Sequence, residues 1–308
     1  MLAAIFPGQG SQYVGMGADW FRQSSLATYV EEISEACGQD IGRLCLESDT
    51  DTLRATENAQ LALFACGFLA YRAWLDAGGR PAHLFAGHSI GEYAALASAE
   101  ALDLTEATAL VKRRGELMAG AGADRPGTMA AVLGLERSSL EEICKAVTVG
   151  TVVIANDNCP GQLVVSGDVS AVEALVEPAK DAGAKRVLPL NVSGAFHSPL
   201  MASSARDMGR ALRQVRFSQG TGKVFSNVLA AANMDPTLWP DLLEKQLENP
   251  VRWTESVKAM ATSGAEAFVE FGAGEVLCGL IKRTLPYAKT SAVREESSLA
   301  AVLDLAAV

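Results

Sequence analysis

Apolar and polar positions follow two different rhythms along the chain, which predict strands and helices in turn. Leu2–Phe6 is a short apolar run that stops at Pro7, and Ala82–Ala86 is a second such run; both are typical of buried strands. Helical spacing of apolar residues follows at residues 60–76, 90–98, 106–119, 199–215, 238–247 and 251–263, and short strands are expected at 224–227, 267–271 and 290–293. This succession predicts an α/β protein.

A central segment has a different order of elements. Strands are predicted at residues 128–135, 151–155, 162–166 and 186–190, with helices at 138–147 and 170–182. Ser138 and Glu141 have the spacing of a capping box at the start of the first of these helices. The order β-α-β-β-α-β is the ferredoxin-like pattern, which can close as its own small sheet.

The Gly- and Ala-rich stretch Ala119–Gly127 precedes this segment and predicts a domain boundary. We therefore expect a large α/β domain made of residues 1–125 and 192–308, interrupted by a small ferredoxin-like subdomain at residues 126–191. The chain has 308 residues, which is long enough for this arrangement and for a sizeable core.

Composition and charge exclude several classes of protein. Hydrophobic residues make up 49% of the chain and charged residues 20%, so a folded protein is expected rather than a disordered one. The net charge is −10, and binding to nucleic acid or to an anionic membrane surface needs Lys and Arg, so neither is an expected partner. The longest apolar run, Leu61–Tyr71, is too short to span a membrane, and the run that stops at Pro7 is too short for a signal peptide.

The six cysteines form no Cys-x-x-Cys pair and show no metal-ligand spacing. Three of them, Cys66, Cys144 and Cys278, lie in apolar surroundings. We therefore expect free thiols in a reducing, cytoplasmic setting, and no metal site.

A candidate nucleophile lies where the second predicted strand gives way to a helix. Gly87-x-Ser89-x-Gly91 has the spacing and the strand-to-helix context of a nucleophile elbow. The glycines allow a sharp turn, and the helix N-terminus that follows favours developing negative charge near Ser89. The alternative is an ordinary turn, because the short string also arises by chance.

A serine nucleophile needs a base, and only three histidines are present: His83, His88 and His197. His83 precedes a buried strand, and an elbow points the side chain of His88 away from Ser89. His197 lies on a loop that leads into a helix, and functional residues concentrate on such connections. His197 is therefore the best candidate base, with a helix-capping or surface histidine as the alternative.

The loop after the first strand, Pro7-Gly-Gln-Gly-Ser-Gln, is the candidate oxyanion site. A dinucleotide fingerprint is disfavoured because Tyr13 stands at its last glycine position, and a P-loop because Met16 follows Gly15. The backbone N–H of Gln9, together with that of Ile90, would instead form a two-donor oxyanion hole.

Arg114 falls on the apolar stripe of the helix predicted at 106–119, at the spacing of Leu110 and Val111. Because an unpaired buried charge is costly, this guanidinium needs a partner. The partner is either an internal Asp or Glu or a carboxylate that a substrate brings in.

Together these motifs resemble the malonyl-CoA:acyl carrier protein transacylases, the acyltransferases of fatty acid synthesis. The resemblance covers essentially the whole chain. It runs through Pro7-Gly-Gln-Gly-Ser-Gln, Gly87-His-Ser-Ile-Gly-Glu-Tyr, Lys112-Arg-Arg-Gly-Glu-Leu-Met, Gly127-Thr-Met-Ala-Ala, Asn158-Cys-Pro-Gly-Gln, Gly194-Ala-Phe-His-Ser-Pro-Leu-Met, Gln246-Leu-Glu-Asn-Pro-Val-Arg-Trp and Glu270-Phe-Gly-Ala-Gly-Glu-Val-Leu.

The resemblance implies an α/β-hydrolase-like large domain with a ferredoxin-like insert. It assigns Ser89 as the nucleophile that bears the acyl group and His197 as the base. It assigns Arg114 as the clamp for the malonyl carboxylate and Gln9 as an oxyanion donor through its backbone. It also implies that Gln246 orients the histidine, in place of the aspartate of a triad.

Three further features are interpreted through the same resemblance. Asn158 is expected to line the pocket. Phe196 before the histidine and Ile90 after the nucleophile resemble malonyl-selective acyltransferases, because Phe196 would fill the space of an α-methyl group. The family usually has Gly-Pro-Gly where this chain has Gly272-Ala-Gly, a loop difference that affects no catalytic assignment.

The implied activity is transfer of a malonyl group from malonyl-CoA to the phosphopantetheine thiol of acyl carrier protein. The implied partners are therefore malonyl-CoA and acyl carrier protein, with no cofactor, and a monomer is expected. The carrier is acidic, so a local basic rim should receive it. The candidate pairs for this rim are Lys112 with Arg113, Lys185 with Arg186, and Lys282 with Arg283.

Three other functions stay open. One is a discrete acyltransferase that acts in trans in a polyketide pathway, with the same chemistry and a different carrier. Another is an α/β-hydrolase esterase or thioesterase, although those enzymes place the histidine late in the chain and often have an HGGG-type loop. The third is a non-catalytic carrier-binding module, which the joint presence of Ser89, His197 and Arg114 disfavours.

Overall fold

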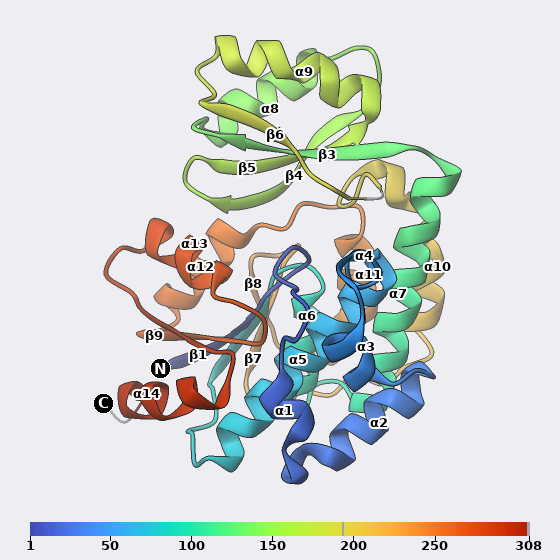
Figure 1. Ribbon diagram of the computed structural model, residues 1–308. Coiled ribbons are helices and arrows are strands. Elements are labelled where there is room, and N and C mark those ends of the chain that lie inside the picture. The colour runs from blue at the N-terminus through green and yellow to red at the C-terminus, as the bar shows by residue number, and fades with distance from the viewer. Residues whose placement is uncertain (193, 307–308) are drawn as a thin grey trace.

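The computed structural model describes residues 1–192 and 194–306, which form two sheets with their own helices (Figure 1). The larger sheet has six strands and the smaller has four. The smaller sheet and its two helices lie above the larger unit in Figure 1, and the helices cover the side that faces away from it. The expected α/β class is confirmed.

The larger sheet has the order β10-β9-β1-β2-β7-β8. Its strands are β1 (Leu2–Phe6), β2 (Leu84–Gly87), β7 (Lys223–Ser226), β8 (Ala231–Asn233), β9 (Ala267–Phe271) and β10 (Lys289–Val293). Neighbouring strands are parallel except β8, which is antiparallel to β7. Phe6 pairs with Gly87, so β1 and β2 end side by side and the loops that follow them meet at one edge.

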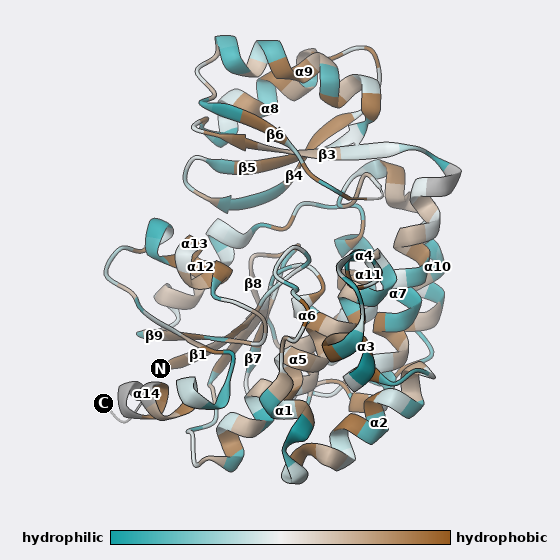
Figure 2. Ribbon diagram, in the orientation of Figure 1, coloured by the Kyte–Doolittle hydropathy of each residue, from teal (hydrophilic) through white to brown (hydrophobic). Residues whose placement is uncertain are grey.

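Helices cover both faces of this sheet. The helices of the larger unit are α1 (Ala18–Arg22), α2 (Ala27–Cys37), α3 (Ile41–Glu47), α4 (Thr50–Arg54), α5 (Thr56–Asp76), α6 (Gly91–Ser98), α7 (Leu104–Asp124), α10 (Ala202–Leu212), α11 (Trp239–Gln246), α12 (Trp253–Thr262), α13 (Val276–Thr284) and α14 (Glu296–Ala306). Short 3-10 turns occur at Ser24–Leu26, Pro199–Met201 and Pro236–Leu238. Because both faces are covered, the central strands are continuous apolar runs rather than alternating ones (Figure 2).

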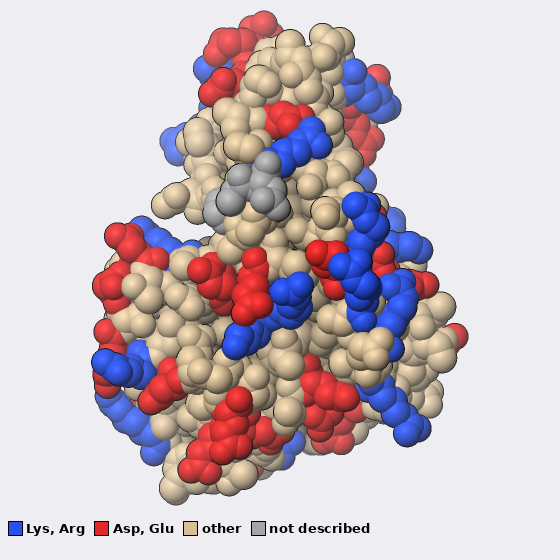
Figure 3. Space-filling model, turned by 90° about the vertical axis from the view of Figure 1, so that its right-hand side faces the viewer, with Lys and Arg blue, Asp and Glu red and all other residues tan. Residues whose placement is uncertain are grey.

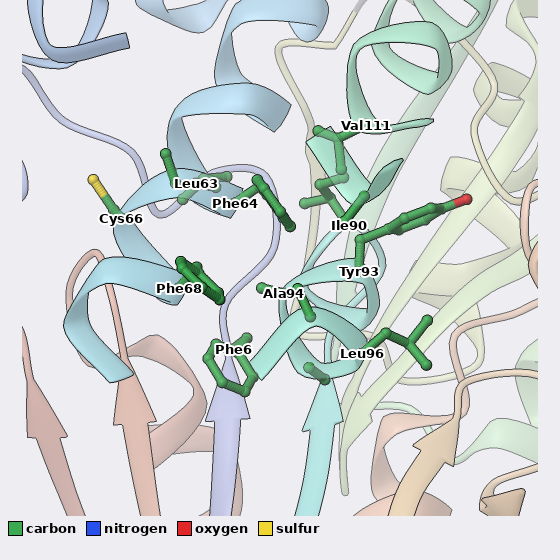
Figure 4. Close-up of a cluster of buried hydrophobic side chains, with 14 of the residues drawn as sticks. Phe6, Leu63, Phe64, Cys66, Phe68, Ile90, Tyr93, Ala94, Leu96 and Val111 are labelled. Carbon is green, nitrogen blue, oxygen red and sulfur yellow. The ribbon is translucent and has the colours of Figure 1, made fainter. Parts of the chain in front are cut away.

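The side chains of β1 show how the two faces are divided. Ala4 and Phe6 belong to the core cluster on the side of α5 and α6, and Ala3 and Ile5 belong to the cluster on the side of α12 and α13. Figure 4 shows part of the first cluster, where Phe6 lies near side chains of α5 and α6. This packing fixes the start of α6 relative to the end of β1.

The smaller unit contains β3 (Gly127–Leu133), α8 (Arg137–Ala146), β4 (Val152–Cys159), β5 (Gln162–Asp168), α9 (Val169–Asp181) and β6 (Arg186–Pro189). The sheet order is β4-β5-β3-β6, with all neighbours antiparallel. This is the β-α-β-β-α-β arrangement that the sequence predicts, and its own core includes Val132, Leu140, Val165 and Leu175.

Two local predictions were wrong. Helix α7 continues to Asp124, past the predicted helix end at residue 119 and through most of the stretch Ala119–Gly127 that predicts a domain boundary, because alanines sustain a helix up to the extended residue Arg125. Helix α8 begins at Arg137 after Glu136, and no side chain caps it. Glu141 binds the Arg137 guanidinium at 2.7 Å instead of closing a capping box with Ser138.

Several elements were not predicted. They are the short helices α1 to α4, the edge strand β8, and the two C-terminal helices α13 and α14. Most of the missed helices have fewer than about three turns, so their apolar periodicity is too brief to stand out in a sequence.

Candidate active site

The turn between β2 and α6 holds Ser89 in a strained conformation at the carboxyl edge of the larger sheet. Ser89 has φ 52°, in the left-handed region. A Cβ at Gly87 would lie 1.8 Å from the carbonyl carbon of Gly91, and one at Gly91 would lie 2.2 Å from the carbonyl oxygen of Phe6. Only glycine fits at these two positions, so the Gly-x-Ser-x-Gly string here forms a sharp strand-to-helix elbow.

Asn227, which directly follows β7, binds the backbone of this elbow with its side-chain amide. Its Oδ1 accepts a hydrogen bond from the backbone N–H of Ser89 at 2.8 Å, and its Nδ2 donates to the carbonyl of Gly87 at 2.7 Å. Asn227 was not predicted as a site residue. The only indication in the sequence was that Asn227 is a polar residue at the end of a predicted strand.

His197 lies against Ser89, with Nε2 2.7 Å from Oγ. Its Nδ1 lies 2.7 Å from the backbone carbonyl oxygen of Gln246, and a carbonyl only accepts, so Nδ1 is the protonated nitrogen. Burial, and then the charge of Arg114, lower the pKa of His197 to about 3. The neutral imidazole therefore presents Nε2 as an acceptor to the Ser89 hydroxyl.

Gln246 reaches the histidine through its main chain rather than its side chain, which refines the sequence interpretation. The side-chain Nε2 donates to the carbonyl of Ser89 at 3.0 Å and to Glu92 Oε2 at 2.5 Å. The side-chain Oε1 accepts from Arg114 Nη2 at 2.8 Å. The amide thus lies between a buried cation and a buried carboxyl group.

Arg114 is fully buried on α7, as its place on the apolar stripe predicts. Its Nη2 donates to Ser89 Oγ at 3.1 Å, and its Nη1 donates to Gln60 Oε1 at 2.6 Å. Within the described part of the chain it forms no ion pair, and its Nε has no partner, so the alternative of an internal Asp or Glu partner is not realised. Burial lowers the pKa of Arg114, as expected for a cation that neutral groups surround.

Of the two expected oxyanion donors, Ile90 directly follows Ser89 in the elbow and Gln9 lies on the loop after β1. In residues 1–192 and 194–306, the backbone N–H groups of Gln9 and Ile90 donate to no other backbone or side-chain group. The loop that contains Gln9 approaches the elbow closely, because a Cβ at Gly8 would lie 2.7 Å from the carbonyl oxygen of His88. Both N–H groups are therefore available to a ligand beside Ser89.

A cavity of about 420 Å³ opens over these groups. It is lined by Gln9, Gly10, Gln12, Arg54, His88, Ser89, Met118, Met129, Asn156, Val164, Leu190, Asn191, Val192, Phe196 and His197. Its walls come from both units, since β3, β5 and the end of β6 face the elbow across it. Phe196 is a wall residue, as expected, whereas Arg54, Gln12 and Asn191 were not anticipated.

The expected position of Asn158 needs correction. Asn158 is not among the residues that line the cavity; its Oδ1 lies 2.8 Å from His88 Nε2. Asn156, two residues earlier on β4, lines the cavity in its place. Irregular pairing of β4 with β5 at these positions shifts the strand so that Asn158 packs behind His88.

The described residues contain no group of His, Cys, Asp and Glu side chains that could hold a metal ion. No helix among them is long and apolar enough to cross a membrane. All six cysteines are free thiols, and Cys144 is the only one of them that is not buried.

Comparisons with known proteins identify the family of this chain. The chain matches the acyl transferase domain family over residues 4–301. A malonyl CoA-acyl carrier protein transacylase from Escherichia coli K12 is 40% identical over 305 residues, which cover 98% of this chain and 99% of the relative.

Solved structures extend the likeness to the whole fold. An acyl carrier protein S-malonyltransferase from Vibrio cholerae has a TM-score of 0.93 at 39% identity, covering 98% of this chain and 99% of that chain. A malonyl-transacylase solved in complex with its type II PKS acyl-carrier protein has a TM-score of 0.94 at 36% identity, covering 99% of both chains. The chain is therefore an acyltransferase and belongs to the acyl transferase family, where its near full-length relatives are malonyl CoA-acyl carrier protein transacylases.

Proposed function

We propose that this protein transfers the malonyl group of malonyl-CoA to the phosphopantetheine thiol of acyl carrier protein, and so supplies malonyl carrier for fatty acid synthesis. The main observation is the buried Arg114 guanidinium, which lies 3.1 Å from Ser89 Oγ and has no carboxylate partner in the described part of the chain. A cation in that position suits an acyl group that ends in a carboxylate.

The first half-reaction forms an ester on Ser89. His197 Nε2 takes the hydroxyl proton as Oγ attacks the thioester carbonyl carbon. The N–H groups of Gln9 and Ile90 donate to the oxyanion of the tetrahedral intermediate. When the carbon–sulfur bond breaks, His197 returns the proton to the sulfur and CoA leaves as its thiol.

The second half-reaction transfers the acyl group to the carrier. The malonyl ester stays on Ser89 with its carboxylate on Arg114. The phosphopantetheine thiol gives its proton to His197 and attacks the ester carbonyl, and His197 then protonates the Ser89 oxygen as it leaves. One thioester replaces another, so the overall transfer is close to thermoneutral. Because the acyl group is held on Ser89 between the two half-reactions, the enzyme should follow ping-pong kinetics.

Hydrogen bonds to neutral groups orient His197, the proposed base, and Arg114, the proposed clamp. The Gln246 carbonyl holds the imidazole in the tautomer that accepts from Ser89. Gln60 and Gln246 hold two nitrogens of the Arg114 guanidinium without neutralising its charge. The positive charge is therefore retained for the carboxylate of the substrate.

Phe196 and Ile90 are proposed to restrict the acyl group to malonyl. Phe196 is only 4% exposed and forms part of the cavity wall next to His197. An aromatic ring at this place reduces the room for an α-methyl group, so methylmalonyl-CoA should be a poorer substrate.

The proposed organisation follows the two sheets. The large domain consists of residues 1–125 and 192–308, and the ferredoxin-like subdomain of residues 126–191. A monomer is proposed as the working unit. The chemistry proposed for Ser89 and His197 needs no cofactor or metal, and a cytoplasmic enzyme fits this function.

The direct test is mass spectrometry of the protein after brief incubation with malonyl-CoA. A malonyl group should appear on Ser89 of the wild-type protein and should be absent from Ser89→Ala. A label on another residue, or no label, would contradict the proposal. Malonyl-, methylmalonyl- and acetyl-CoA tested side by side would define the acyl preference.

A second candidate is an acyltransferase that serves a polyketide carrier in trans. The observation that favours it is the likeness to the malonyl-transacylase solved with a type II PKS carrier. The chemistry would be the same, so the test compares carriers. A much higher kcat/KM with a polyketide carrier than with a fatty acid carrier would favour this second function.

A further inference from the structure

Glu92 is a buried carboxyl group that the proposed mechanism does not use. It lies in the first turn of α6, three residues after Ser89, and is 1% exposed. It forms no ion pair within residues 1–192 and 194–306. Burying a carboxyl group without a cationic partner costs free energy of folding. A buried glutamate this close to the nucleophile therefore suggests a role in the site.

The hydrogen bonds of Glu92 connect the two residues that hold the elbow. Its Oε2 accepts from Gln246 Nε2 at 2.5 Å, and its Oε1 accepts from the backbone N–H of Asn227 at 3.3 Å. Both of these partners are neutral, and both bind the backbone around Ser89 directly.

The hydrogen-bond pattern determines which way the Gln246 amide faces. An amide has one donor end and one acceptor end, whereas the Glu92 carboxylate, which is ionised above about pH 7 because burial raises its pKa to about 7, only accepts. Glu92 therefore receives the NH2 end of Gln246, and the oxygen end is turned toward Arg114 Nη2, 2.8 Å away. In the opposite orientation, an NH2 group would face the guanidinium, and both would be donors.

We propose that Glu92 is a positioning residue for Arg114, which acts by fixing the orientation of the Gln246 amide and thereby sets the preference for acyl groups that end in a carboxylate. The inference rests on the proposed function, because it assumes that Arg114 binds the malonyl carboxylate. It assigns to Glu92 no contact with the substrate.

Glu92→Gln is the informative change. The new side chain has nearly the same shape but only one acceptor oxygen, so it cannot place an acceptor at both the Oε1 position that faces Asn227 and the Oε2 position that faces Gln246. We expect kcat/KM for malonyl-CoA to fall on the order of tenfold more than kcat/KM for acetyl-CoA, with most of the loss in KM for malonyl-CoA. Glu92→Asp keeps a group that only accepts, and it should recover part of the malonyl preference.

The matched control is Glu270→Gln. Glu270 is another fully buried glutamate, on β9, and its Oε2 accepts from the backbone N–H of Cys278 at 2.9 Å rather than from a site residue. Its replacement removes a buried carboxyl group without touching Gln246. The malonyl-to-acetyl ratio should stay at the wild-type value in this variant.

The outcomes separate the inference from the proposed function. Absence of malonyl-serine in the wild-type protein refutes both. If wild-type Ser89 is malonylated, an unchanged malonyl-to-acetyl ratio in Glu92→Gln, or a similar shift in the Glu270 control, refutes the role of Glu92 alone. Should Glu92→Gln fail to fold, as judged by near-ultraviolet circular dichroism, Glu92→Ala removes both acceptor oxygens, and a malonyl-to-acetyl ratio in that variant equal to that of wild type would also refute it.

Discussion

Arg114 Nη2 donates to Ser89 Oγ across 3.1 Å, so the proposed clamp and the proposed nucleophile share a hydrogen bond in the free protein. The same oxygen lies 2.7 Å from His197 Nε2. An incoming malonyl carboxylate would compete for the guanidinium and would free the hydroxyl from it. The binding of the correct acyl group is therefore coupled to the release of the nucleophile, and this coupling leads to the first prediction.

Arg114→Ala should remove the preference for malonyl-CoA far more than it slows acyl transfer in general. The reason is that a charge-assisted contact with a carboxylate is lost for malonyl and was never present for acetyl. We expect the ratio of the two kcat/KM values to fall by roughly a hundredfold. Steady-state transfer from both CoA esters measures this ratio, and equal losses would contradict the clamp.

The pH dependence of serine acylation should reflect the lowered pKa of His197. The base acts only when neutral, and burial with the Arg114 charge lowers the pKa of His197 to about 3. The rate of Ser89 acylation should therefore stay flat from about pH 8 to about pH 5, where an ordinary histidine would already be protonated. Rapid-quench mass spectrometry would follow this step.

A companion variant tests the cause of that shift. Arg114→Gln removes the positive charge next to the imidazole, so the pKa of His197 should rise and the acid limb of the acetylation rate should move to higher pH. If the acid limb of the wild-type acetylation rate lies near pH 6.5, or if this limb has the same pH in Arg114→Gln as in wild type, then Arg114 does not lower the pKa of His197.

Glu270 should make the protein less stable as the pH rises. Burial raises the pKa of Glu270 from 4.5 to about 7, so the folded protein keeps a proton that the unfolded chain loses. The stabilisation is complete below about pH 4.5 and is lost as the pH rises through about 7, which amounts to about 3 kcal/mol. Urea unfolding near pH 5 and pH 8 should show a smaller difference for Glu270→Gln than for wild type.

Phe196→Ala should admit methylmalonyl-CoA. The truncation enlarges the cavity beside His197, where the ring is a wall residue. We expect the methylmalonyl-to-malonyl ratio of kcat/KM to rise on the order of tenfold. If wild type already uses both substrates equally well, Phe196 does not determine the selectivity.

The carrier should bind next to basic side chains that are free of other partners. Lys112 Nζ donates to the carbonyl of Cys37, and Arg283 binds the carbonyl of Pro160, so these two candidates are occupied. Arg113 is paired with Glu116. Lys282 is exposed and has no ion pair or hydrogen bond among the described residues.

Lys282→Glu should therefore raise KM for the carrier several-fold and leave malonylation of Ser89 unchanged. Lys223→Glu is the control, because Lys223 is exposed at the start of β7, at the opposite edge of the sheet from Ser89. Acidic and basic side chains are interspersed on the face drawn in Figure 3, so the net charge of −10 does not form one continuous field there. Equal KM changes in both variants would indicate a general charge effect.

Local patterns in the sequence predicted much of the site. The glycine spacing around Ser89 and the strand before it led to the elbow, because a sharp turn depends on a few consecutive residues. The periodicity around Arg114 predicted its burial, because neighbours on one helix face share one environment. The unpredicted parts depend on neighbours that are far apart in the sequence, such as Gln60, which accepts a hydrogen bond from Arg114 across 54 residues.

The sequence by itself determined the α/β class, the elbow and the buried arginine, since each follows from the local spacing of residues. It also indicated one best histidine, because the chain has only three. Only the tertiary structure decided how these groups are held. Asn227 is 138 residues from Ser89, and the Gln246 side chain contacts Glu92 across 154 residues. A hydrogen bond depends on distance and direction in space, and those arise only when the sheet edge brings the ends of several elements together.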